Sequence, residues 1–279
     1  MSDPGRPRPR WPTPAAAFES EEAARLKQEV VDVGRKLWLR QYVDGNGGNI
    51  SCRLTDEWVL CTPTLMSKFD LRPEDLCLVD MQGSHLAGTR HRSSEILLHL
   101  AILKSVPEAA AVVHCHPPHA TAYALAGVVP PERLLAEHEV FVGPVALLPY
   151  ETPGTQACAD AVIPYAKDHN SLLMINHGLV TWADTPTHAE WYVEVLDTTC
   201  RVCILTAHLG VSPSQIPLDR IGGLMALKRR LGMPDARFAP AGTGEPSPKV
   251  LPGRVAARPR RASTPRPPGH PGADEDAEI

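Results

Sequence analysis

The chain has 279 residues, of which 43% are hydrophobic and 22% are charged, and its formal net charge is −4. This composition can bury a sizeable core, and its charge balance disfavours nucleic acid or an anionic membrane surface as the main partner. The seven cysteines are an odd number in apolar or mixed segments, so we expect reduced thiols and a cytoplasmic location. No apolar run approaches the roughly 18 residues that a membrane span requires, and the first 14 residues lack the apolar core of a signal peptide.

Both ends of the chain are rich in proline and poor in large apolar residues. Such segments cannot offset the entropy of ordering by burial, so we expect disordered tails at 1–18 and 233–279. The C-terminal tail is basic from Lys249 to Arg266 and then acidic from Asp274 to Glu278. A single folded domain is therefore expected at 19–232.

The predicted elements of this domain follow from apolar periodicity and turn residues. In chain order they are a helix at 19–42, strands at 50–54, 58–61 and 76–80, a helix at 94–104, a strand at 110–116, a helix at 117–126, an extended segment at 140–148, a helix at 155–166, strands at 172–175 and 179–182, and helices at 186–209 and 214–231. The strands within 50–61 and within 172–182 are too close in sequence for parallel crossover connections. An antiparallel or mixed sheet flanked by helices is therefore favoured.

Candidate metal ligands lie at the end of the strand 110–116. Successive strand side chains alternate between faces, so His114 and His116 point to one side and Cys115 to the other. His177 stands at another strand end, before a glycine that permits close backbone approach. Three imidazoles form a ligand set that a catalytic zinc ion uses while one position stays open. The alternative is a satisfied polar core, and His119 is expected to support the structure rather than to bind metal.

A candidate anion site precedes the second predicted helix. Ser93 or Ser94 is a natural N-cap, and the free amides at a helix N-terminus attract anions such as phosphate. The glycine-rich loop 44–51 could add backbone amides and the side-chain amide of Asn46 or Asn49. An ordinary capped helix would have the same sequence. This segment therefore indicates an anion site only when it is considered together with the glycine-rich loop.

Five short motifs carry a resemblance that spans roughly residues 20 to 210. They are Gly-Gly-Asn-Ile-Ser at 47–51, Thr-Pro-Thr at 62–64, Ser-Ser-Glu at 93–95, Val-Val-His-Cys-His-Pro-Pro-His at 112–119 and Asn-His-Gly at 176–178. In this order they resemble the class II aldolase/adducin family, which includes L-fuculose-phosphate aldolase, L-ribulose-5-phosphate 4-epimerase, methylthioribulose-1-phosphate dehydratase and the adducin head. The resemblance implies an α/β fold, a three-layer αβα sandwich with a central, mostly antiparallel sheet. It also implies a homotetramer with the active site at a subunit interface.

The resemblance also implies roles for individual residues. His114, His116 and His177 resemble the metal ligands of the family, and Glu95 resembles its catalytic acid/base. The residues at its substrate and phosphate-binding positions are Asn49, Thr64, Ser93 and Ser94. The implied cofactor is Zn²⁺, with Mn²⁺ or Fe²⁺ as alternatives, because three imidazoles and a carboxylate suit several divalent ions.

The implied activity is that of a zinc-dependent aldehyde-lyase that cleaves a sugar, expected to be a phosphorylated ketose. In this reaction the metal stabilises the enediolate formed on carbon–carbon cleavage, and Glu95 moves the proton. An epimerase, a dehydratase and a decarboxylase are alternatives on the same site. A noncatalytic, adducin-like interaction module is a further alternative from a different class.

Three departures from the aldolase pattern leave the substrate open. Leu65 stands where the aldolases have glycine after Thr-Pro-Thr. A tyrosine that assists proton transfer in the aldolases falls near 136–139, where His138 or Glu139 would have to substitute for it. The C-terminal tyrosine of the aldolases and epimerases is also missing, because Tyr192 is the last tyrosine in the chain. In the epimerases, aspartate replaces the glutamate at position 95.

Overall fold

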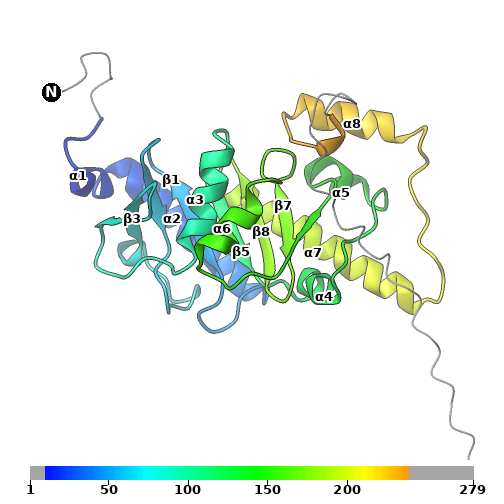
Figure 1. Ribbon diagram of the computed structural model, residues 1–279, viewed down its shortest axis with the longest axis horizontal. Helices are drawn as coiled ribbons and strands as arrows, with labels where there is room; N and C mark the ends of the chain where they lie inside the picture. The colour runs from blue at the N-terminus through cyan, green and yellow to red at the C-terminus, as the bar shows by residue number, and fades with distance from the viewer. Residues whose placement is uncertain (1–9, 239–279) are drawn as a thin grey trace, which may run out of the picture.

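The structure is a computed structural model and describes residues 10–238. Eight strands form one sheet in the order β4-β3-β2-β1-β5-β8-β7-β6, in which only β6 and β7 run parallel (Figure 1). Their bounds are β1 Asn49–Arg53, β2 Trp58–Cys61, β3 Cys77–Asp80, β4 His85–Ala87, β5 Ala111–Cys115, β6 Ala146–Leu148, β7 Ser171–Met174 and β8 Gly178–Ala183. The expectation of a mostly antiparallel sheet is confirmed.

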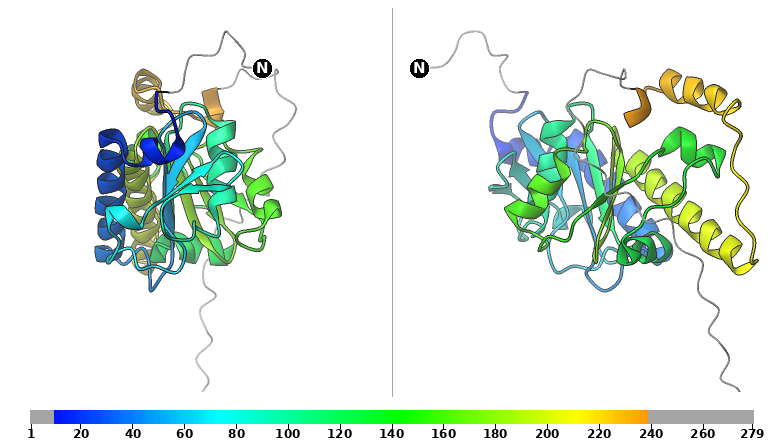
Figure 2. Two further views of the ribbon diagram at one scale, coloured as in Figure 1. Left: turned by 90° about the vertical axis from the view of Figure 1, so that its left-hand side faces the viewer. Right: turned by 45° about the vertical axis from the view of Figure 1, so that its right-hand side comes forward.

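Helices cover both faces of the sheet, which gives the expected three-layer αβα arrangement. The α-helices are α1 Pro14–Phe18, α2 Glu21–Leu39, α3 Ile96–Ser105, α4 Pro118–Ala126, α5 Ala136–Phe141, α6 Gln156–Val162, α7 Pro186–His208 and α8 Ile221–Arg230, with short 3₁₀ turns at Pro73–Asp75 and Ala236–Phe238. Figure 2 shows α2 and α7 on one face of the sheet and α3 and α6 on the other. Within residues 10–238, no helix is both long enough and apolar enough to cross a membrane.

The central strands explain where polar side chains can gather. On β5, Ala111, Val113 and Cys115 pack into the core shared with α2 and α7. Because side chains alternate along a strand, His114 faces the opposite side, toward α3. On β1, Ile50 and Cys52 pack against the α2 side, so Asn49 also faces α3. β1 and β5 pair with Asn49 opposite His114.

The region 140–148 differs from the predicted extended segment. It begins inside helix α5, turns at Gly143 with φ of 80°, and becomes strand β6 only at Ala146. The helix buries His138 and Glu139, and Glu139 pairs with Arg237, almost a hundred residues further along the chain. The prediction was wrong here because this pairing is not visible in local periodicity.

The final helix is shorter than predicted, because residues 214–217 lie outside it and α8 begins only at Ile221. Proline lacks the backbone N–H that a helix interior needs, and Pro217 precedes the helix. Strand β4, a three-residue edge strand, was not predicted.

The chain ends contribute more contacts than tails would. Within 1–18, α1 is capped by Thr13, whose side chain accepts from Ala16 N, and Phe18 is buried in the core. Lys27 Nζ donates to Phe18 O at 2.7 Å. At the other end Asp235, beyond the expected boundary at 232, is buried as well. The remaining parts of the expected tails, 1–9 and 239–279, lie outside the described residues.

Candidate active site

Three histidines lie together where strand β5 ends and strand β8 begins. His114 is in β5, His116 follows that strand, and His177 is in the turn between β7 and β8. Each offers one ring nitrogen, and these nitrogens lie within 4.8 Å of one another. The Nε2 atoms of His114 and His116 are 3.2 Å apart. Two nitrogens that bind one tetrahedral zinc ion at about 2.05 Å are separated by about 3.3 Å, so the arrangement fits a shared metal ion.

Gly178 permits this close approach. A Cβ atom at this position would lie 2.6 Å from Cys115 O and 2.6 Å from Cδ2 of His116. The turn before it is tight, since Asn176 has φ of 55° and His177 N donates to Met174 O at 3.1 Å. Any side chain at 178 would therefore displace one of the histidines.

Two of the three imidazoles, those of His114 and His177, are held in the neutral form that a metal ion requires. His114 is fully buried, and its Nδ1 donates to Leu179 O at 2.9 Å, which leaves Nε2 without a hydrogen. Burial lowers the pKa of His114 well below its ordinary value, and the neighbouring His177 and His116 lower it further. Burial also lowers the pKa of His177.

Glu95 stands immediately before helix α3 with one carboxylate oxygen facing the histidines. Oε2 lies 3.7 Å from His114 Nε2 and 3.5 Å from His177 Nε2. This oxygen is buried, and it has no hydrogen-bond partner among residues 10–238. Leaving such an acceptor unpaired costs about 1–3 kcal/mol or more. A metal ion or a substrate proton beside the histidines would satisfy it.

The other oxygen of Glu95 is held by a hydrogen bond from Asn49. Asn49 Nδ2 donates to Glu95 Oε1 at 3.1 Å, and Asn49 Oδ1 lies 2.5 Å from His99 Nε2. His99 Nδ1 in turn lies 2.8 Å from Ser51 Oγ. The side chains of Asn49, His99 and Ser51 are all buried. The position predicted for phosphate binding, Asn49, therefore also positions the carboxylate.

Two members of this group, His99 and Ser51, were missed by the sequence reading. Their spacing carried a signal, because His99 follows Glu95 by four residues and Ser51 follows Asn49 by two. Such spacings place side chains on one face of a helix and on one face of a strand. The signal becomes specific only once α3 is known to pack over β1 and β5.

The predicted anion-binding residues lie on two neighbouring segments. Thr62 O accepts from Ser93 N at 3.1 Å, and Thr64 N donates to His91 O at 3.0 Å. Ser94 is exposed, Thr64 is partly exposed and Ser93 is buried. The capping prediction was wrong in detail: Glu95 is the N-cap of α3, and Ser93 Oγ accepts from Glu95 N at 3.2 Å.

A buried lysine ties the glycine-rich loop to the segment after Thr-Pro-Thr. Lys68 Nζ donates to Asn46 O at 3.2 Å and to Met66 O at 2.8 Å. Burial lowers the pKa of Lys68 to about 8, although the charge of Glu95 opposes this shift. These two hydrogen bonds fix the glycine-rich loop, which approaches the histidines, to the segment after Thr-Pro-Thr.

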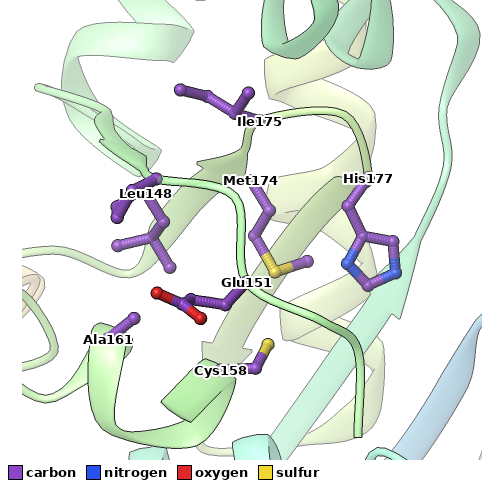
Figure 3. A pocket seen from close by; sticks show the side chains of 8 residues that line it. Leu148, Glu151, Cys158, Ala161, Met174, Ile175 and His177 are labelled. Atoms are coloured by element: carbon purple, nitrogen blue, oxygen red, sulfur yellow. The ribbon is translucent and has the colours of Figure 1, made fainter. Parts of the chain in front are cut away.

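A small cavity lies beside His177. Its volume is about 10 Å³, room for about one water molecule. Figure 3 shows the side chain of Met174 between Glu151 and His177. The lining residues are Leu148, Pro149, Glu151, Cys158, Ala161, Met174, Ile175 and His177. In this conformation the cavity is too small to admit a sugar phosphate.

Comparisons with known proteins agree with this geometry. Residues 28–204 match the family described as Class II Aldolase and Adducin N-terminal domain. The chain belongs to the class II aldolase/adducin family. A 3-oxo-tetronate 4-phosphate decarboxylase from Cupriavidus necator is 34% identical over 183 residues, which are 64% of this chain and 83% of that protein. A 5-deoxy-D-ribulose 1-phosphate aldolase from Bacillus thuringiensis is 30% identical over 71% of this chain and 92% of that protein.

A solved structure extends the comparison to the fold. A Klebsiella pneumoniae protein described as a candidate aldolase, epimerase or decarboxylase superposes with a TM-score of 0.68 and 29% identity. The superposition covers 72% of this chain and 98% of that structure. The resemblance inferred from the five motifs is thus confirmed at the level of family and fold.

Several residues depart from the family pattern or lie away from the histidines. Leu65, where the aldolases have glycine, is 81% exposed and adopts φ of 54°, a left-handed conformation that favours glycine. His119 is not part of the histidine cluster, because its Nδ1 lies 3.0 Å from Asp197 Oδ2.

The two suggested substitutes for the missing tyrosine are enclosed by the chain. His138 is 2% exposed and Glu139 is 0% exposed. The Glu139 carboxylate accepts from Arg237 Nη1 at 2.8 Å and from the backbone of Arg133 at 2.5 Å. Tyr192, the last tyrosine, is also buried. None of these three side chains is free to exchange a proton with a substrate.

Proposed function

We propose that this protein is a metal-dependent lyase acting on a phosphorylated sugar or sugar acid, in which it breaks the bond between the carbon beside the carbonyl group and the carbon beyond it. The favoured reaction is decarboxylation of a 3-oxo sugar-acid phosphate. Aldol cleavage of a ketose phosphate, the reaction placed first from sequence, is the second candidate. The observation that carries the proposal is the buried, unpaired Oε2 of Glu95 beside the ring nitrogens of His114 and His177.

The three histidines would hold the metal ion. The fit rests on the 3.2 Å separation of two Nε2 atoms and on the neutral imidazoles of His114 and His177. A bound Zn²⁺, Mn²⁺ or Fe²⁺ would supply positive charge that stabilises an enediolate. Glu95 supplies the carboxyl group that moves a proton, while Asn49 holds its other oxygen.

The proton-transfer groups favour decarboxylation over aldol cleavage. Aldol cleavage requires a base that removes the proton from the hydroxyl group of the departing aldehyde carbon. The candidates for this second base, His138 and Glu139, are buried within the chain. In decarboxylation the bond to the carboxylate carbon breaks, CO₂ leaves, and its electron pair stays on the substrate. A single group then has to return one proton to carbon, and Glu95 can fill this role.

Phosphate recognition is proposed for Thr64, Ser93 and Ser94, together with the second amide hydrogen of Asn49. These residues lie on the paired segments 62–64 and 91–93 and at the start of α3, where backbone amides favour an anion. The substrate names of the two enzyme relatives, a tetronate 4-phosphate and a ribulose 1-phosphate, support a phosphorylated substrate here.

The proposed function is tested first by metal content. His116→Ala removes one nitrogen of the cluster and is expected to lose the bound divalent ion, whereas His119→Ala is expected to retain it because His119 binds Asp197. Elemental analysis of the purified proteins gives the metal content. Equal metal content in His116→Ala and in the unmodified protein would contradict the site.

The second part of the test identifies the products. Incubation with 3-oxo-tetronate 4-phosphate is expected to release CO₂ and a three-carbon ketose phosphate, and Glu95→Gln is expected to slow this reaction by about 10²–10⁴-fold. Release of an aldehyde from 5-deoxy-D-ribulose 1-phosphate, with no release of CO₂ from 3-oxo-tetronate 4-phosphate, would make aldol cleavage the favoured reaction. Absence of turnover with intact metal binding would favour the noncatalytic module.

A homo-oligomer, expected as a tetramer, is proposed from the exposed apolar side chains of one projecting segment. We define the arm as residues 201–220, which comprise the end of α7 and the chain that leads toward α8. The arm extends away from the sheet in Figures 1 and 2. Its large exposed apolar residues are Val202, Leu205, Leu209, Val211 and Leu218. Large exposed apolar side chains gathered on one segment are typical of an interface, and we propose that a second copy of the chain covers them.

A further inference from the structure

A continuous line of hydrogen bonds leads from the protein interior to the carboxylate of Glu95. We propose that His99 is a positioning residue that fixes the side-chain amide of Asn49, and thereby keeps Glu95 Oε1 occupied and Oε2 directed at the histidine cluster. The inference rests on the proposed role of Glu95 as the group that moves the proton. It assigns a function to His99 and Ser51, whose hydrogen bonds join each other and Asn49 rather than the histidine cluster.

The contacts allow only one placement of the hydrogens. A carboxylate only accepts, so the atom of Asn49 that lies 3.1 Å from Glu95 Oε1 must be the amide nitrogen. The amide oxygen then faces His99, 2.5 Å away, so the Nε2 atom of His99 must carry the hydrogen. In a neutral imidazole the other nitrogen, Nδ1, is then an acceptor, and it receives the hydroxyl hydrogen of Ser51 at 2.8 Å. Each of the three contacts thus joins one donor to one acceptor.

His99 decides which way the Asn49 amide points. An asparagine amide that is turned by 180° would present its oxygen to the carboxylate oxygen of Glu95, and two acceptors would repel each other. The single N–H of His99 selects the productive orientation, because it can only pair with the amide oxygen. Ser51 is compatible with this tautomer, since its hydroxyl group can donate to the bare Nδ1 of His99.

Burial makes this arrangement of donors and acceptors independent of pH over the physiological range. His99 is 1% exposed and Ser51 is 0% exposed, so water does not compete for their hydrogen bonds. Burial and, to a smaller extent, the nearby His114 lower the pKa of His99 to about 3, although the charge of Glu95 opposes this shift. The groups that face His99 are Ser51 and Asn49 from β1, His114 from β5 and Glu95 from the start of its own helix. Because His99 stays neutral, its Nε2 remains the donor to Asn49 and its Nδ1 remains the acceptor from Ser51.

The test measures the turnover of two His99 variants in metal-loaded form. The substrate is whichever of 3-oxo-tetronate 4-phosphate and 5-deoxy-D-ribulose 1-phosphate the unmodified protein converts. His99→Gln places an amide nitrogen near the position of Nε2 and can still donate to Asn49, whereas the side chain of His99→Asn is too short to do so. His169→Asn is the matched control, because His169 is also buried and bonds to Tyr165 O at 3.1 Å, away from the site.

We expect His99→Asn to lower kcat by about 10- to 100-fold with metal content unchanged. His99→Gln is expected to recover most of this loss, and His169→Asn is expected to retain full kcat. Unchanged kcat in folded His99→Asn would overturn the proposal. Equal losses in the asparagine and glutamine variants would also overturn it, because they would indicate that packing rather than the donated hydrogen is what matters.

A spectroscopic readout is independent of turnover. ¹⁵N NMR of the imidazole is expected to show His99 with a protonated Nε2 and a bare Nδ1 throughout about pH 5 to 8, a range in which an ordinary histidine titrates. The opposite tautomer, or titration within this range, would overturn the proposal. Full turnover in Glu95→Gln would instead reject the proposed function, and the tautomer would still decide whether His99 orients Asn49.

Discussion

Glu190 illustrates how burial sets the charge of a single residue. It lies on α7 with no exposed surface, and Lys36 Nζ on α2 is 3.6 Å from its carboxylate. Burial raises the pKa of Glu190 to about 8, and the neighbouring carboxylate of Glu194 adds to this shift, whereas Lys36 and Arg40 oppose it. The folded protein therefore prefers the protonated form of this residue.

A pH dependence of stability follows from this shift. Because the folded pKa lies above the unfolded value, the stabilising effect is fully present below about pH 4.3 and is lost as the pH rises through about 8. Glu190→Gln keeps the shape without the charge. We expect its free energy of unfolding to exceed that of the unmodified protein by about 1–3 kcal/mol at pH 8.5, and the difference to shrink toward pH 5.

Urea unfolding at several pH values measures this difference. Glu74→Gln serves as the control, since Glu74 is an exposed glutamate whose neutralisation should have little effect. A constant difference between Glu190→Gln and the unmodified protein at every pH would contradict the assigned pKa shift.

At the scale of elements, a buried ion cluster fixes helix α8 to the rest of the domain. Lys228 is fully buried, and its Nζ donates to Val142 O and contacts Asp235 Oδ2, both at 2.9 Å. Arg237 links Asp235 to Glu139 of α5 through contacts of 2.7 and 2.8 Å. Few large apolar side chains of α8 are buried, so its position depends on these polar contacts.

Lys228→Met is expected to release α8. The substitution removes a buried donor and leaves Asp235 with Arg237 as its remaining partner, which should cost about 2 kcal/mol or more. Hydrogen exchange should accelerate in α8 and α5 but not in β5 or β8. Arg230→Met, at an exposed position of the same helix, is the control. Acceleration throughout the sheet would indicate global rather than local loss of stability.

At the scale of the whole molecule, the arm (residues 201–220) stands apart from a domain whose sheet is covered on both faces. Leu205 is 55% exposed, Leu209 is 75% exposed and Leu218 is 72% exposed. Burying one such side chain contributes about 1.5–3 kcal/mol. The arm can thus supply a substantial part of the association free energy of an oligomer.

Charged substitutions in the arm should dissociate this oligomer. Leu205→Asp combined with Leu209→Asp is expected to shift the mass measured by light scattering to that of a single chain, because two carboxylates would have to be buried in the interface. Leu39→Asp alters an exposed leucine outside the arm and is expected to leave the mass unchanged. Monomers in the unmodified protein, or dissociation by Leu39→Asp alone, would contradict the assignment.

The sequence could predict those features that depend on neighbouring residues. Alternation along one strand placed His114 and His116 on one side, and helical periodicity located α2, α3 and α7 to within a few residues. The ordered motifs were sufficient for the family and for the three-layer fold. Local patterns could not predict that 136–141 forms a helix, because the partner of Glu139 is Arg237 at the far end of the chain.

The candidate site shows the same division. The sequence by itself predicted the histidines from their types and spacing, and Glu95 from the family resemblance, and the structure brings these side chains together. Only the tertiary structure decided how they are oriented. Asn49 bridges Glu95 and His99 because β1 pairs with β5 in one register and α3 packs above both strands. Hydrogen bonds between residues almost fifty positions apart depend on that register, and a local pattern does not contain it.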